Sequence, residues 1–560
     1  MKFNVWCTGL MMLASASMVV SSASALSTVS DHAWQSAPTI PGNNCIDNNT
    51  NGFPNDCRTV MANLVKGTWV YNGGSIDTVL SGNGAATYTQ FRNLFRYSPV
   101  TGVVNGSFAP RFYTNVGTST TPDYSVVPAG IIRKIVSGPS NSIYVAGDFR
   151  QVSSSGSSTI INQNGLAKVN TTTGEIDPLF KPNLDCAATY NKPCTIFTAA
   201  YIDTLNYVLV GGLFTAANGS PETGFVILDG TTGATIPRTK VTLARNLRGA
   251  RPYVRTIAIN PVNHKEFFIG GEFSDIGVYP NTFQTYRYGM LKLQFDANNV
   301  LSSSSWNAMD ALSASRPYTY AADLAHGAPL AGKCGVSATW LRQMTYSEDG
   351  KYIVLGAGLG GAYDVHPALC DTLSVFNAQP VNGVYDQRQM PLVYNHTATD
   401  TIDSVCVLNK VAYIGGHFRS NNMVVYKSGI RTSAVPYYVS STPTTTKPVL
   451  SQGAPNAHFG FAAINIDPSV PSVYGLAVPT WNATQLVSIP DADLQAVYLN
   501  PFPWGPTAAT NTGRGYGWNA VSCVPAAQSP TGKDLVIFGG DGKTINGDKT
   551  RNKIGQFNGL

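Results

Sequence analysis

Charged residues are scarce in this chain: Asp, Glu, Lys and Arg together account for only 12% of its 560 residues, about half of the usual share. After the N-terminal region, no apolar run approaches the roughly 20 residues that span a bilayer. The net charge of +6 is small for this length and does not indicate a nucleic-acid partner. The sequence therefore predicts no transmembrane segment in the mature chain and no nucleic acid among its partners.

Catalytic signatures are also missing. The chain contains no G-x-S-x-G elbow, no H-E-x-x-H motif and no P-loop, and its histidines are scattered singly. No C-x-x-C pair occurs that would favour a zinc site. Almost no stretch has the 3.6-residue apolar spacing of an amphipathic helix. These absences favour an all-β protein that requires no cofactor and is not an enzyme.

The N-terminal 25 residues have the pattern of a secretory signal peptide. Lys2 is followed by the apolar stretch LMMLASASMVV and by the small residues SSASA before Leu26. An uncleaved anchor helix is the alternative, but the apolar run is short and interrupted by serines. We expect signal 1–25, an N-terminal segment 26–59, and a mature chain that is secreted or held at a cell surface.

The cysteines agree with an oxidising compartment. Cys7 would leave with the signal peptide, and the other eight cysteines form an even set. Proximity pairs six of them, and the last pair follows by elimination. The expected disulfides are Cys45–Cys57, Cys186–Cys194, Cys334–Cys370 and Cys406–Cys523.

Six Asn-x-Ser/Thr sequons would make the chain a glycoprotein if its source is eukaryotic, although several are expected by chance in a chain rich in Asn, Ser and Thr. The acceptor residues are Asn48, Asn105, Asn170, Asn218, Asn395 and Asn482.

One phrase recurs along the chain: an apolar strand, two glycine-like residues, a variable residue and a phenylalanine. Examples are IYVAGDF, VLVGGLF, FFIGGEF and AYIGGHF. The second glycine-like positions are Gly74, Gly147, Gly212, Gly271, Ala357, Gly416, Gly475 and Gly540, at steps of 73, 65, 59, 86, 59, 59 and 65 residues. The sequence therefore repeats a unit of about sixty residues, with Gly475 as its weakest member.

Each unit has the pattern of about four short strands, and abundant turn residues join them. A four-stranded sheet cannot bury both of its faces alone, so neighbouring sheets must stack. We predict that residues 60–560 form a single β-propeller of seven or eight four-stranded blades. A strand from residues 60–72 is expected to complete the last blade and so protect the sheet edges.

The phrases IYVAGDFRQV, LVGGLFTAANG and FIGGEFSDIG, with their spacing, resemble the delta-type β-propeller repeat of secreted and cell-surface proteins. The same region is similar to the propeller of the fungal cortical polarity-marker family, whose members lie outside the plasma membrane. The resemblance implies a fold and a location, and it brings no catalytic motif.

The variable residue of the phrase is the first candidate for function. If these strand ends surround the propeller channel, their side chains would face a common axis and hold a cation or a polar ligand. The alternative is a set of solvated turn residues without a shared target. The candidates are Asp148, Glu272, His417 and Asp541.

A loop between two cysteines is the second candidate. Asp47, Asn49 and Asn51 have the spacing of calcium ligands, and Asp56 supplies another carboxylate. Position twelve is Arg58 instead of a glutamate, so a turn closed by a disulfide is the alternative reading. The sequence therefore requires no cofactor, and calcium is the candidate that this loop offers.

A basic stretch is the third candidate, because it contains no acidic residue and could dock an anionic partner. The alternative is a loop whose charges are merely solvated. Its cations are Arg238, Lys240, Arg245, Arg248, Arg251 and Arg255.

Two main functions follow. The first is a non-enzymatic binding or scaffold module for an extracellular protein or glycan. The second is a secreted carbohydrate-active hydrolase or lyase with acids such as Asp148, Glu272 and Asp541 at the channel mouth, which requires carboxylates about 5 to 10 Å apart. A calcium-dependent structural protein is a third possibility.

Overall fold

The computed structural model describes part of the chain, and every structural statement below concerns that part. The described residues are 37–38, 40, 59–82, 86–89, 91–113, 130–186, 194–244, 252–273, 275–278, 285–286, 289–307, 341–357, 372–380, 392–396, 401–416, 418, 424–427, 430–434, 460–471, 474–476, 478, 518–540 and 554–559.

Seven antiparallel sheets of one kind follow each other along the described chain. We number them in chain order. The first is β1 (Thr59–Lys66), β2 (Trp69–Ser75) and β5 (Leu94–Tyr97); the second is β7 (Ile132–Ser137), β8 (Ser142–Gly147) and β11 (Leu166–Asn170); the third is β13 (Thr195–Ile202), β14 (Tyr207–Leu213) and β17 (Phe225–Asp229).

The other four sheets include two with additional strands. The fourth is β19 (Tyr253–Ile259), β20 (Glu266–Glu272), β23 (Met290–Phe295) and β24 (Leu301–Ser303). The fifth is β25 (Leu341–Tyr346), β26 (Tyr352–Ala357), β27 (Thr372–Asn377), β28 (Val393–His396), β31 (Val424–Lys427) and β32 (Ile430–Ala434). The sixth is β29 (Ile402–Leu408), β30 (Val411–Gly416) and β33 (Phe461–Asn465), and the seventh is β34 (Ala520–Val524), β35 (Leu535–Gly539) and β36 (Ile554–Asn558).

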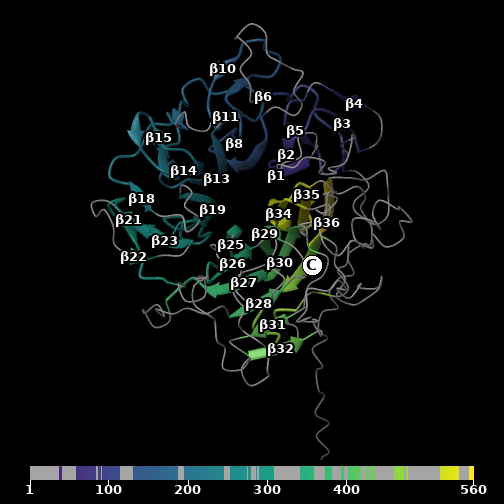
Figure 1. Ribbon diagram of the computed structural model, residues 1–560. Helices are drawn as coiled ribbons and strands as arrows, with labels where there is room; N and C mark the ends of the chain where they lie inside the picture. Colours follow the sequence, from purple (N-terminus) through teal and green to yellow (C-terminus); the bar gives the residue numbers. More distant parts are fainter. Residues whose placement is uncertain are drawn as a thin grey trace, which may run out of the picture.

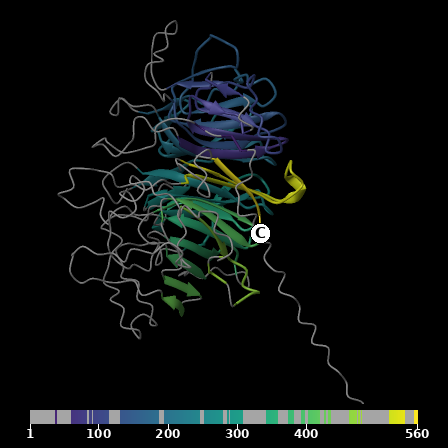
Figure 2. The ribbon, with the colours of Figure 1, turned by 90° about the vertical axis from the view of Figure 1, so that its right-hand side faces the viewer.

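These sheets surround a central axis (Figure 1), and Figure 2 shows the same ring from the side. The first strands of neighbouring sheets contact each other in the order β1, β7, β13, β19, β25, β29 and β34, and β34 contacts β1 again. The chain is therefore an all-β propeller, as the sequence predicted. Seven sheets are present in the described part of the chain.

The fourth strand of a unit is often reduced. In the first three sheets it consists of a single bridge, between Tyr97 and Val104, Val169 and Ile176, or Leu228 and Thr235. The chain then crosses over to pair with the next unit in small outer sheets. These are β6 (Arg111–Tyr113) with β9 (Gln151–Ser153) and β10 (Ile161–Asn162); β12 (Leu184–Asp185) with β15 (Ala216–Ala217) and β16 (Ser220–Pro221); and β18 (Val241–Ala244) with β21 (Asp275–Val278) and β22 (Thr285–Tyr286). A further hairpin joins β3 (Val79–Leu80) to β4 (Thr87–Tyr88), and Ala526–Gln528 form a 3-10 turn.

The two glycines of the repeated phrase have separate roles. A Cβ atom on Gly270, the first of the pair in β20, would lie 2.1 Å from Cδ2 of Leu341 in the next sheet. A Cβ atom on Gly271 would lie 2.1 Å from the carbonyl oxygen of Tyr253 in its own sheet. The first glycine therefore allows the sheets to approach each other, and the second allows two backbones to approach. The second contact recurs at Gly74, Gly147, Gly212 and Gly416.

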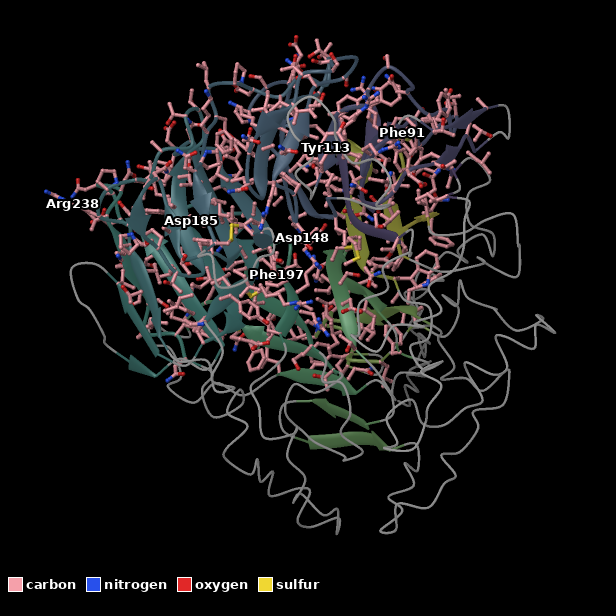
Figure 3. The ribbon with its side chains drawn as sticks, turned by 45° about the horizontal axis from the view of Figure 1, so that its top comes forward. Phe91, Tyr113, Asp148, Asp185, Phe197 and Arg238 are labelled. Atoms are coloured by element: carbon pink, nitrogen blue, oxygen red, sulfur yellow. A yellow bond between two sulfur atoms is a disulfide. The ribbon has the colours of Figure 1, made fainter. Side chains whose placement is uncertain are left out.

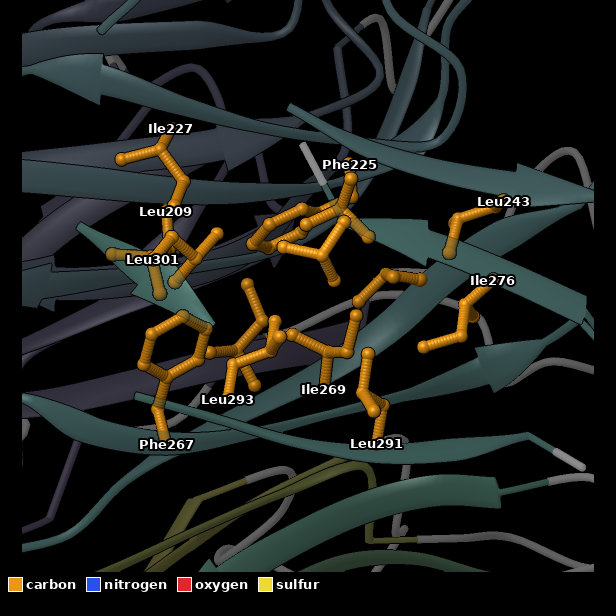
Figure 4. Packing of buried hydrophobic residues seen from close by; sticks show 14 of the residues in the cluster. Leu209, Phe225, Ile227, Leu243, Phe267, Ile269, Ile276, Leu291, Leu293 and Leu301 are labelled. Atoms are coloured by element: carbon orange, nitrogen blue, oxygen red, sulfur yellow. The ribbon is translucent and has the colours of Figure 1, made fainter. Parts of the chain in front are cut away.

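The core lies between successive sheets. Figure 4 shows the cluster between the third and fourth sheets, where Leu209 and Ile227 meet Phe267 and Leu293. Each of these side chains is at most 1% exposed. The phenylalanine that ends the repeated phrase is buried at Phe149, Phe214, Phe273 and Phe418.

The ring closes through side-chain and backbone contacts between the first and seventh sheets. The Val60 amide donates to the carbonyl oxygen of Gly540 at 3.1 Å, and Nδ2 of Asn63 donates to that of Ile537 at 3.1 Å. The prediction that residues 60–72 complete the last blade is wrong. A two-residue turn with Gly67 at φ 60° folds β1 back onto β2, and both strands belong to the first sheet. Ala37 and Ile40 are buried in the cluster at this seam.

Hydrogen bonds between sheets recur at one position of the third strand. There, a polar side chain donates to a backbone carbonyl oxygen of the next sheet. The pairs are Arg96 to Thr171, Lys168 to Gly230 at 3.3 Å, Lys292 to Ala378 at 2.6 Å, and Gln556 to Pro99 at 2.9 Å. The last pair runs from the seventh sheet to the first and therefore belongs to the closure.

Gly475 does not begin a unit of its own. Its amide donates to the carbonyl oxygen of Asn465 at 2.7 Å, and the Asn465 amide donates to that of Leu476 at 3.0 Å. With φ of 76°, Gly475 is a turn glycine that brings the chain beside β33. Its similarity in spacing to the glycine pairs was misleading, because a turn after the third strand also favours glycine.

Candidate functional site

A β-bulge interrupts the first strand at the same position in six of the seven sheets. A bulge adds one residue to a strand and changes the direction of its side chain. The residues at this position are Met61, Arg133, Phe197, Arg255, Arg342 and Asp403, and Asn519 holds the matching position in front of β34.

Residues of all seven sheets line one cavity of about 110 Å³, and the seven residues at the bulge position are among them. Since the first strands surround the ring axis, we call this cavity the channel site. Figure 3 shows Phe197 toward the middle of the ring and Arg238 at its outer edge. The charged residues lining the channel site are Arg133, Lys134, Arg255, Arg342 and Asp403.

The charge of Arg133 is compensated within the second sheet. Its Nε lies 2.8 Å from Oδ1 of Asp148, and its second terminal nitrogen lies 2.6 Å from Oδ2. Burial disfavours the charged guanidinium, but the attraction and hydrogen bonds of Asp148 together outweigh it and raise the pKa of Arg133. This two-point contact also fixes the guanidinium plane.

Arg342 has a looser partner. Its Nε lies 3.6 Å from Oδ1 of Asp403, and the two side chains are 14% and 15% exposed. The pair joins β25 to β29 and therefore connects the fifth and sixth sheets.

Arg255 lacks such a partner: its side chain has no hydrogen bond or ion pair to the described residues. Its guanidinium carbon lies 5.1 Å from the ring centre of Phe197, and that of Arg133 lies 5.5 Å from the same ring. Burial lowers the pKa of Arg255 to about 10, and the positive charge of Arg342 acts in the same direction. Arg255 is therefore charged at neutral pH and faces the channel site without a counter-charge in contact.

Lys134 is in the same situation. It follows Arg133 in β7 and lines the channel site, and its ammonium group has no hydrogen bond or ion pair within the described ranges. Burial lowers its pKa, because the charged ammonium loses hydration.

Phe197 is held in place from the neighbouring sheet. Its ring centre lies 5.1 Å from that of Tyr253, whose hydroxyl donates to Oε1 of Glu272 at 2.6 Å. Burial and the Glu272 carboxylate raise the pKa of Tyr253 to about 12, so the hydroxyl keeps its proton at neutral pH. Glu272 therefore fixes Tyr253, which packs against the Phe197 ring that Arg255 contacts.

The structure describes two of the four predicted channel-mouth residues. Asp148 and Glu272 are buried, and each is bonded to a side chain of its own sheet. Neither lines the channel site; they support Arg133 and Tyr253 from behind. His417 and Asp541 lie outside the described residues.

The predicted basic patch is divided in the structure. Arg238 is exposed at the rim, and Nζ of Lys240 donates to the carbonyl oxygen of Pro221 at 2.7 Å. Arg255 lies instead in the channel site. Arg245, Arg248 and Arg251 fall outside the described residues. The described members therefore do not form one patch.

Two predicted disulfides are confirmed. Cys186 is bonded to Cys194 next to β13, and Cys406 of β29 is bonded to Cys523 of β34. The second bond was inferred by elimination and joins the sixth and seventh sheets. The predicted pairs Cys45–Cys57 and Cys334–Cys370 lie outside the described residues, as do Asp47, Asn49, Asn51 and Asp56 of the calcium loop.

The sequons have different surroundings. Asn105, Asn170 and Asn218 lie in turns, but the Asn218 side-chain nitrogen donates to the Gly233 carbonyl oxygen at 2.9 Å. Asn395 is fully buried and donates to the carbonyl oxygen of Gly475, so the fold has no space for a glycan there. The prediction of a glycan at Asn395 is therefore incompatible with this fold. Asn48 and Asn482 lie outside the described part.

Sequence reasoning missed most of the channel residues. Arg133, Arg342 and Asp403 each follow the first apolar residue of the strand that precedes a glycine pair, in IRK, LRQ and IDS. Aligning those strands, instead of the glycine phrases, would have brought these residues into one column.

No helix in the described ranges is long and apolar enough to cross a membrane. Among the same residues, no group of three or more His, Cys, Asp or Glu side chains is placed to hold a metal ion.

Comparisons with known proteins give likenesses of fold only. No family model and no curated protein matches the chain. Among solved structures, the Dos1 propeller is 11% identical, with a TM-score of 0.31, over 65% of this chain and 66% of that one, just under two thirds. Hydrazine synthase of Kuenenia stuttgartiensis is 9% identical, with a TM-score of 0.35, over 65% of this chain and 95% of that one. The computationally designed Ika8 protein is 9% identical, with a TM-score of 0.36, over 89% and 96%.

Proposed function

We propose that this chain is a secreted or cell-surface β-propeller that acts as a non-enzymatic binding module, and that its channel site captures an anionic group of an extracellular protein or glycan. The observation that carries the proposal is the presence of two cations, Lys134 and Arg255, that line one cavity without a counter-charge in contact. Both side chains are half-buried, and a charge that has lost part of its hydration without gaining a counter-charge is costly to the free protein. An anionic ligand would remove that cost, which favours binding.

The signal-like N-terminus and the two disulfides support an extracellular location. The resemblance to the delta-type repeat of secreted and cell-surface proteins supports the same location. The alternative, a carbohydrate-active hydrolase or lyase, gains no support from Asp148 and Glu272, because each carboxylate is already bonded to a neighbouring side chain.

Binding of small anions tests the proposal. We expect phosphate, sulfate or acetate to bind the purified protein in isothermal titration calorimetry, and Arg255→Met to weaken binding at least tenfold, because it removes one positive charge but keeps an unbranched side chain. Arg238→Met is the matched control, since this exposed arginine lies at the rim, and it should leave the affinity unchanged. If none of the three anions binds to the wild type, the proposed function is wrong.

A further inference from the structure

The charge balance of the channel site indicates how much negative charge its ligand brings. Arg133 is neutralised by Asp148, and Arg342 is paired with Asp403. Lys134 and Arg255 have no counter-charge in contact among the described residues. A singly charged ligand would neutralise only one of these two cations.

The size of the cavity limits how the two charges can be arranged. Pockets that enclose a whole drug-sized molecule measure about 300–1,000 Å³, whereas the channel site measures about 110 Å³. Only a terminal group fits, so both negative charges must lie on one small centre. An extended dicarboxylate would separate its charges by several bonds.

The site also offers donors for several oxygen atoms. Phe197 packs against Arg255 in a cation–π contact, and the guanidinium retains N–H groups at its edge. The side-chain amide of Gln343 lines the same cavity and has no hydrogen bond to the described residues. A compact oxyanion with three free oxygens can use the guanidinium, the ammonium and this amide together.

Resting on the function proposed above, we propose that the channel site binds a doubly charged phosphoryl group, either as free phosphate or as a phosphate monoester at the end of a larger ligand. The three donors, two cationic groups and one amide, come from β7, β19 and β25, which belong to the second, fourth and fifth sheets. The ligand therefore lies on the axis and not between one pair of sheets.

The pH dependence of binding separates a dianion from a monoanion. A phosphate monoester loses its second charge near pH 6, whereas inorganic sulfate keeps both charges. We expect the affinity for glucose 6-phosphate to fall about tenfold between pH 7 and pH 5, and the affinity for sulfate to remain nearly constant. The other charged or titratable groups around the site are Arg133, Asp148, Tyr253, Glu272, Arg342 and Asp403, and the sulfate titration reports any change in them.

Titrations at pH 7 with inorganic phosphate, glucose 6-phosphate, glucose and acetate complete the experiment. Phosphate should bind at least tenfold more tightly than acetate, and glucose should not bind. Tighter binding of glucose 6-phosphate than of free phosphate identifies an ester as the ligand, and the reverse order identifies free phosphate. Acetate binding as tightly as phosphate would overturn the dianion proposal and leave the anion-binding module standing, whereas failure of every anion overturns both.

Variants give an independent check. Lys134→Met and Arg255→Met should each weaken phosphate binding at least tenfold, and both should reduce the preference for phosphate over acetate. Arg238→Met should change neither quantity. If Lys134→Met leaves the preference intact, two-cation recognition is wrong. The wild-type titrations decide the question should a variant fail to fold.

Discussion

At the scale of single residues, the repeated phrase reflects collisions that glycine avoids. The second glycine lies against a carbonyl oxygen of the adjacent first strand, next to the bulge that directs a side chain toward the axis. The glycine and the channel residue are therefore linked: the same local backbone that requires the one positions the other.

Replacing the second glycine should be costly. We expect Gly271→Ala to lower the free energy of unfolding by about 3 kcal/mol, because the added methyl group meets the Tyr253 carbonyl oxygen at 2.1 Å. Gly219→Ala is the comparison: no atom lies within 4 Å of its Cβ position, and only its φ of 79° opposes the change, at about 1 kcal/mol. Chemical denaturation measures both, and equal losses would contradict the steric explanation.

At the scale of strands, recurring side chains fasten each sheet to the next. Four third strands carry a donor that reaches a carbonyl oxygen of the following sheet. Gln556 is the member at the seam: it also accepts a hydrogen bond from the Tyr97 hydroxyl at 3.0 Å. Since Gln556 is fully buried, its removal would leave two buried polar groups unpaired.

We therefore expect Gln556→Ala to reduce the free energy of unfolding by about 3 kcal/mol, since each unpaired buried group costs about 1–3 kcal/mol. The exposed Gln528 of the 3-10 turn provides the matched control, and Gln528→Ala should have an effect within about 0.5 kcal/mol. Denaturant midpoints measure the difference. A seam that depends on the backbone contacts of Val60 alone would give two similar values.

At the scale of the whole molecule, closure depends on contacts between the first and seventh sheets, and these two sheets exchange no strand within the described residues. The Cys406–Cys523 bond reinforces the neighbouring junction, between the sixth and seventh sheets, and spans 117 residues, whereas Cys186–Cys194 spans 8. A bond that closes a longer loop restricts the unfolded chain more.

Removal of the long-range disulfide should therefore destabilise the protein more. We expect Cys406→Ala with Cys523→Ala to cost about 2 kcal/mol more than Cys186→Ala with Cys194→Ala, from the difference in loop length. Both double variants keep all other cysteines, so denaturation under non-reducing conditions compares them directly. If removal of Cys186–Cys194 lowered the stability more, local packing and not the entropy of the unfolded chain would determine how much each disulfide stabilises the protein.

The sequence predicted the sheets more accurately than it predicted the residues of the candidate site. An apolar run ending in a glycine pair identifies the second strand of a sheet. Glycine is required there because a Cβ atom would collide with neighbouring atoms, and this requirement recurs in each repeat. The seam was misjudged because the pairing of β1 depends on a two-residue turn around Gly67. Asp148 and Glu272 were predicted at the channel mouth, but neither lines the channel site. Their partners, Arg133 and Tyr253, come from another strand, whose bulge is visible only in three dimensions.

In a ring of repeated sheets, the turns, the hydrogen bonds between sheets and the glycine pairs occur many times, but the ring has a single axis. The seven described sheets therefore share one central cavity, to which three of them contribute an arginine from the bulge position. The proposed function therefore implies a stoichiometry of one axial ligand per chain, however many similar units the chain contains. Avidity for a surface that bears many ligands would require several chains held close together.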